Sequence, residues 1–101
     1  MQGNNLISLD LRQNSKLNEL VSGYNQFKRL DLSYNPELHD VSCTNTPIEE
    51  LNLKNILVPR NFYFTDNESL NCVEVDDPDW FYANMAGSFD QGVTFAEDCE
   101  Y

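Results

Sequence analysis

The sequence predicts a β-rich solenoid, a coil of about four turns with short parallel strands on two faces. The main observation is an internal repeat of 21 residues, which aligns Leu9-Asp10-Leu11, Leu30-Asp31-Leu32 and Leu51-Asn52-Leu53. A unit this small cannot bury its own apolar face, so its stability must come from stacking on its neighbours. Inside each motif, apolar residues alternate with a polar one, the pattern of a strand with one buried face.

Each 21-residue unit divides into two half-units, and both halves predict a strand. The first half-units predict one parallel sheet, with strands near residues 9–11, 30–32, 51–53 and 73–75. The second half-units predict another, with strands near residues 20–22, 41–43 and 62–64. Successive strands in each sheet should lie about 4.8 Å apart, the usual spacing between paired strands.

Asparagine residues follow the predicted strands, where the chain must turn a corner. Asn14 and Asn35 fall at equivalent positions of successive units. Asparagine tolerates left-handed backbone and can hydrogen-bond to nearby backbone groups, so we expect these side chains to stack in one column. The next equivalent position is Ile56, which predicts that this corner is rebuilt.

The tail predicts a short helix from Asp77 to Gly87 that closes the open end of the coil. Asp77 suits the helix cap, Pro78 the first turn and Gly87 the end. We expect apolar residues of the tail to cover the open end of the coil, drawn from Trp80, Phe81, Ala83, Met85, Phe89, Val93 and Phe95. The alternative is that this aromatic-rich segment is a platform for a ligand.

The three cysteines differ in their positions. Cys43 occupies an inward position of the repeat, where a free cysteine behaves as a small apolar residue. Cys72 and Cys99 bracket the tail, so we expect a disulfide between them, which implies an oxidising compartment. Closing that loop should contribute roughly 3–4 kcal/mol in the chain-entropy model. The alternative is a cytosolic protein with all three thiols reduced.

The spacing Phe27-x-x-Leu30-x-Leu32-x-x-Asn35 is the leucine-rich repeat signature. With its nested half-units, the sequence resembles the IRREKO-type leucine-rich repeats that are abundant in secreted and surface proteins of Bacteroidetes-type bacteria. The resemblance covers about residues 6–56, and the tail resembles the C-terminal cap of such arrays. It implies that this chain is a module of a longer exported protein. In this chain, residues 1–5 would be a disordered or cloning-derived start, residues 6–64 the repeats, and residues 65–101 the last strand and the cap.

Charge is distributed unevenly along the chain. Residues 1–60 hold all six Lys and Arg with seven Asp and Glu, whereas residues 61–101 hold ten acids and no base. A nucleic acid or anionic membrane partner would require clustered Lys or Arg, so neither is expected. The apolar runs are also too short for membrane insertion. The acidic tail is interpreted as a solvated face, with a cation site or an acidic docking surface as alternatives.

Motifs for catalysis or cofactor binding are missing from the sequence. His39 is the single histidine, and no Gly-x-Ser-x-Gly, phosphate-binding loop or His-Glu-x-x-His occurs. The run from Asp76 to Asp79 lacks the spacing and glycine of an EF-hand loop, although calcium binding stays an alternative. We therefore predict no enzyme activity, no cofactor and no metal site.

The remaining candidate for function is the outer face of the first sheet, because solenoids present registered rows of side chains to other proteins. The predicted face residues are Arg12, Arg29, Asp31, Glu50, Asn52 and Lys54. We predict a secreted or cell-surface module for protein binding or adhesion, in possible contact with flanking domains of a longer chain. The alternative is a structural spacer or cap with no ligand of its own.

Overall fold

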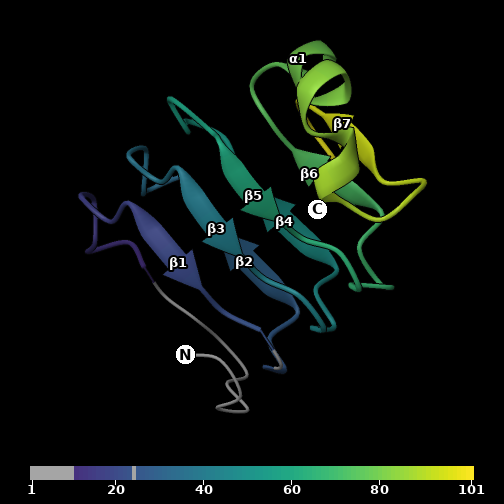
Figure 1. Cartoon of the computed structure of the whole chain (residues 1–101), viewed down its shortest axis with the longest axis horizontal. Helices are drawn as coiled ribbons and strands as arrows, with labels where there is room; N and C mark the ends of the chain where they lie inside the picture. Colours follow the sequence, from purple (N-terminus) through teal and green to yellow (C-terminus); the bar gives the residue numbers. More distant parts are fainter. Residues whose placement is uncertain (1–10, 24) are drawn as a thin grey trace.

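The computed structural model describes residues 11–23 and 25–101, and the strands in this part form two parallel sheets. One sheet has the order β1-β3-β5, formed by β1 (Glu19–Val21), β3 (Asp40–Ser42) and β5 (Asn61–Tyr63). The other has the order β2-β4-β6-β7, formed by β2 (Arg29–Asp31), β4 (Glu50–Asn52), β6 (Cys72–Glu74) and β7 (Thr94–Ala96). From β1 to β6 the chain passes alternately through the two sheets (Figure 1).

The register between strands follows the sequence repeat. Leu20 pairs with Val41 in one sheet, and Leu30 pairs with Leu51 in the other, each an offset of 21 residues. The offset becomes 22 where Leu51 pairs with Val73. The predicted parallel pairing is therefore confirmed for the described strands, while the strand expected at residues 9–11 falls mostly outside them.

The strands begin and end one residue earlier than predicted. The sequence suggested residues 30–32, for example, whereas β2 ends at Asp31. Leu32 is buried just beyond the strand, and its N–H still donates to the carbonyl oxygen of Asn52 at 2.9 Å. The second apolar residue of each motif thus packs at the start of the corner. Strand β7 was not predicted as a strand.

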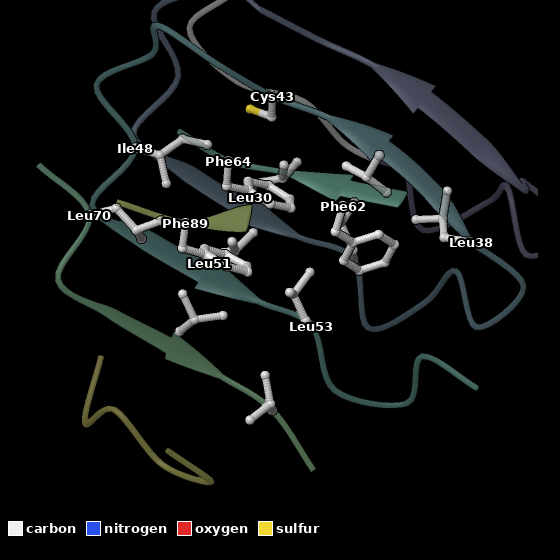
Figure 2. Packing of buried hydrophobic residues seen from close by; sticks show 14 of the residues in the cluster. Leu30, Leu38, Cys43, Ile48, Leu51, Leu53, Phe62, Phe64, Leu70 and Phe89 are labelled. Carbon is white, nitrogen blue, oxygen red and sulfur yellow. The ribbon is translucent and has the colours of Figure 1, made fainter. Parts of the chain in front are cut away.

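The apolar core lies between the two sheets. Figure 2 shows Leu30 and Leu51 of one sheet and Phe62 of the other pointing into a common interior. All three side chains are buried, together with Leu53 and Cys43 just beyond the strand ends. Burying an aliphatic or aromatic side chain of this size contributes about 1.5–3 kcal/mol. Strands of only three residues form few ladder hydrogen bonds, so this packing is what stabilises them.

Buried asparagine amides stabilise the corners. Asn35 Nδ2 donates to the backbone oxygens of Asn14 at 2.7 Å and Leu11 at 3.0 Å. Asn14 itself is exposed, so the predicted column is a buried side chain above a backbone carbonyl and not a stack of two side chains. A corner carbonyl that no sheet ladder reaches is satisfied in this way.

A second corner is held by Asn67, a role that was not predicted from the sequence. Its Nδ2 donates to the backbone oxygens of Cys43 at 2.8 Å and Phe64 at 3.0 Å. Its Oδ1 accepts from the Thr46 N–H at 2.9 Å and from the Thr46 hydroxyl at 3.1 Å. Asn25, Thr46 and Asn67 are spaced by 21 residues, and the threonine in the middle hides the column from an asparagine search.

The tail covers the far end of the two sheets (Figure 1). Helix α1 (Pro78–Asn84) begins after Asp77, whose Oδ1 accepts from the N–H of Trp80 at 3.2 Å, as the capping prediction requires. The helix ends earlier than predicted, and Gly87 lies in the short 3-10 helix η1 (Ala86–Ser88). Among the predicted cover residues, those buried are Phe81, Met85, Phe89 and Phe95, while Val93 is half-buried and Trp80 and Ala83 are exposed.

The covering segment packs mainly through its aromatic rings. The ring of Phe89 stacks on that of Phe64 with centroids 5.1 Å apart, and it also meets the ring of Phe95 at 5.0 Å. The hydroxyl of Tyr82 accepts the N–H of Phe95 in the edge strand β7 at 3.0 Å. This bond occupies a donor that an edge strand would otherwise offer to another chain.

Replacing Asn67 with Ala should destabilise the fold. Loss of the amide leaves the buried carbonyls of Cys43 and Phe64 without their donor, so the free energy of unfolding should fall by about 2–4 kcal/mol. Urea denaturation measures this change. Asn71→Ala is the control, since Asn71 is exposed. Similar losses for the two variants would contradict the role of the buried amide.

The predicted disulfide between Cys72 and Cys99 is present, joining residues that are 27 positions apart. Cys43 is free and buried, and burial raises the pKa of its thiol to about 11. Because the thiolate is the reactive form of cysteine, this thiol should be inert in the folded protein.

Peptide mapping without reductant should therefore recover one linkage, Cys72–Cys99. Iodoacetamide should leave Cys43 unmodified in the folded protein at pH 8 and alkylate it after unfolding in urea, because unfolding removes the burial that raises its pKa. Three alkylated thiols from unreduced material, or rapid native alkylation of Cys43, would contradict this assignment.

Candidate functional site

The outer side of strands β2, β4 and β6 is the candidate binding face, termed here the first-sheet face. Its side chains stand in rows because the strands are paired in parallel register. Arg29 is opposite Glu50, and Asp31 is opposite Asn52, which in turn is opposite Glu74. Neighbouring side chains on one side of a sheet are close enough to interact, so these rows form a single surface.

The one positive charge in these rows is paired. Arg29 Nε donates to Glu50 Oε2 across the two strands. This hydrogen bond and the attraction of the Glu50 carboxylate raise the pKa of Arg29 above its ordinary value. The guanidinium is exposed, so such a pair contributes little to stability and remains available to a partner.

Asp31 and Asn52 use one side-chain oxygen each to close the turn after their strand. Asp31 Oδ1 accepts from the N–H of Ser33 at 2.9 Å and from its hydroxyl at 2.5 Å. Asn52 Oδ1 accepts from the N–H of Lys54 at 2.9 Å. These bonds fix the two side chains at the strand ends, so the face is preorganised.

A hollow of about 250 Å³ lies on this face. Its lining residues are Arg29, Leu30, Asp31, Glu50, Asn52, Glu74 and Tyr101. The structure thus brings four of the six predicted face residues together. Arg12 and Lys54 are placed in turns beyond the strands and do not line the hollow.

Tyr101 is the member of this hollow that sequence reasoning missed. Its hydroxyl accepts from the N–H of Leu51 at 3.1 Å and donates to the carbonyl of Cys72. It therefore lies between β4 and β6 and links them where their ladder would otherwise continue. Partial burial raises the pKa of this phenol. A residue outside the repeats, 50 positions from its partner Leu51, leaves no periodic signal.

The outer face of the other sheet has a different character. Asp40 Oδ1 accepts a hydrogen bond from Asn61 Nδ2 at 2.8 Å, and His39 Nδ1 lies 3.3 Å from the same oxygen. The hydrogen bond from Asn61 and then the nearby His39 side chain lower the pKa of the Asp40 carboxyl. Val21 and Tyr63 add exposed apolar surface to this side.

Replacing Asn61 with Ala should raise the pKa of Asp40 toward its ordinary value, because the largest cause of the depression is removed. A depressed pKa stabilises the fold above the pKa of the unfolded chain, and this contribution disappears as the pH falls through the folded value. The stability difference between wild type and Asn61→Ala should thus shrink below about pH 4. NMR titration of the Asp40 carboxyl carbon, with Asn71→Ala as control, measures the pKa; an unchanged value in Asn61→Ala would contradict the assignment.

Across residues 11–23 and 25–101, no three His, Cys, Asp or Glu side chains are grouped so as to hold a metal ion. The described helices also include none long and apolar enough to cross a membrane. The two sheet faces offer charged, amide and hydroxyl groups for contact with another molecule.

Comparison of the chain with protein-family models, with curated proteins and with solved structures finds no match.

Proposed function

We propose that this chain is a protein-binding or adhesion module, built as a leucine-rich repeat coil and presented by an exported bacterial protein. The coil proposal is supported by the pairing of strands at offsets of 21 and 22 residues and by the alternation of the chain between the two sheets. Repeat proteins with this organisation use a rigid sheet surface for contact with other proteins.

The observation that carries the binding proposal is the set of registered rows on the first-sheet face. Arg29, Glu50 and Asn52 are held by the strand pairing, and the hollow between them leaves room for a partner side chain. Tyr101 adds an aromatic group, a residue type enriched at protein interfaces. Mixed charge at such a surface favours specific contacts and steers association.

The proposal of export is supported by the disulfide between Cys72 and Cys99. Disulfides persist in oxidising compartments such as the periplasm or the cell exterior. The strongly acidic character of residues 61–101 adds solubility to a displayed module.

Reversing the charges of Arg12, Arg29 and Lys54 to Glu should slow partner association and increase its salt sensitivity. These residues carry half of the positive charge of a chain whose net charge is −11. They would offset the general repulsion between this chain and an acidic or polar partner surface, so we expect a loss of about tenfold or more in association rate. The assay is affinity capture with the intact protein, followed by binding kinetics for each purified partner.

The matched control reverses Lys16, Lys28 and Arg60, the other three positive residues, and therefore has the same net charge. A partner that binds wild type and the control variant but not the face variant would support the proposal. Equal binding by both folded triple variants would remove this face from consideration. A structural spacer without a ligand would then be favoured.

A further inference from the structure

The segment that joins β4 to β5 exposes a run of apolar side chains. Leu57 is 74% exposed and Val58 is 59% exposed, and they lie between Ile56 and Pro59 in sequence. Single exposed apolar residues are ordinary on protein surfaces, whereas neighbouring ones beside a concavity are typical of an interaction site.

These residues form one wall of a cleft of about 290 Å³. The opposite wall comes from the start of helix α1, where Trp80 is 39% exposed and Phe81 is buried. Leu53, which is buried, also lines the cleft. The indole and phenyl rings lie edge to face with centroids 5.3 Å apart. An apolar side chain entering this cleft would therefore contact aliphatic and aromatic groups together.

Hydrogen bonds hold both walls in place. The N–H of Leu57 donates to the carbonyl of Pro36 at 3.1 Å, which fixes the exposed segment against the preceding repeat. The N–H of Asn55 donates to Asp76 Oδ2 at 2.8 Å, which ties this segment to the residues after β6. With Asp77 capping α1, the cleft is built by the fold and does not need to form on binding.

The polar lining of the cleft is acidic. Asp76 and Asp77 line it, and Asp79 follows in the first turn of α1. Residues 61–101 contain no Lys or Arg that could neutralise them from within the tail. A second copy of this chain would bring the same net charge of −11, so charge complementarity favours a basic partner.

We infer that this cleft binds a basic protein segment, which inserts one aliphatic side chain beside Leu57 and Trp80 and places flanking Lys or Arg groups at Asp76 and Asp77. The cleft shares no lining residue with the hollow on the first-sheet face. The inference therefore does not depend on the function proposed for that face.

Trp80 is the single tryptophan of the chain, so its fluorescence reports on this cleft. The probe is a synthetic peptide with the sequence Gly-Lys-Leu-Arg-Gly, blocked at both ends and free of aromatic residues. Its titration into the intact protein at low salt should change the Trp80 emission saturably. Two control peptides replace the basic residues with Glu or the leucine with Ser, and neither should bind.

Two protein variants separate the apolar and electrostatic parts. Leu57→Ser removes an exposed methyl-rich side chain and should weaken peptide binding about tenfold. The double variant Asp76→Asn and Asp77→Asn keeps an acceptor oxygen for Asn55 and for the helix cap but removes both charges, so it should weaken binding at low salt and reduce the salt dependence.

Each variant has a matched control. Val21→Thr changes an exposed apolar residue on the other sheet, and Glu68→Gln with Glu97→Gln removes the same charge from exposed positions outside the cleft. Both controls should bind the basic peptide as wild type does. The inference is overturned if no saturable change occurs, if the acidic peptide binds equally, or if Leu57→Ser binds like wild type. A last outcome would also overturn it: without peptide, the Trp80 emission changes with protein concentration and sedimentation shows a dimer. A second copy of the chain would then fill the cleft.

Discussion

The structure depends on satisfying backbone groups at corners that the sheets do not reach. Strands of only three residues leave much of the chain in turns, and buried turn carbonyls are costly without a donor. Asn35 and Asn67 supply that donor, each bonding to carbonyls in its own or the preceding repeat. These amides connect the repeats independently of the strand pairing, so the corner carbonyls beside the apolar interior have donors that the sheets do not supply.

The same constraint explains how the stack ends. A growing parallel sheet always presents one more row of donors and acceptors, so its last strand must be covered or capped. Here Tyr82 accepts a donor of β7, and Tyr101 links β4 to β6. The disulfide from Cys72 to Cys99 keeps the end of the tail against the sheet that it covers.

Closing the stack also creates the two candidate surfaces. Tyr101 becomes part of the hollow on the first-sheet face, and Trp80 becomes a wall of the acidic cleft. The two surfaces differ in chemistry, since the first carries mixed charge and hydrogen-bonding groups and the second is apolar with a carboxylate lining. The two proposed binding surfaces would give one chain two separate contacts, and their linkage in one chain would make these contacts mutually reinforcing.

The sequence by itself determined the parallel pairing, because a leucine repeat of fixed period favours the register that buries the central apolar residue of each strand. It also predicted the capping of the helix by Asp77 from local chemistry, and the pairing of Cys72 with Cys99 because these residues bracket the tail while Cys43 has an inward position in the repeat. Only the tertiary structure decided the role of Asn67, the strand at Thr94–Ala96, the place of Tyr101 and the cleft beside Leu57. The role of Asn67 follows the repeat period but is hidden because Thr46 interrupts the asparagine column. The other three features depend on how the tail packs on the repeats, and these contacts leave no periodic signal in the sequence.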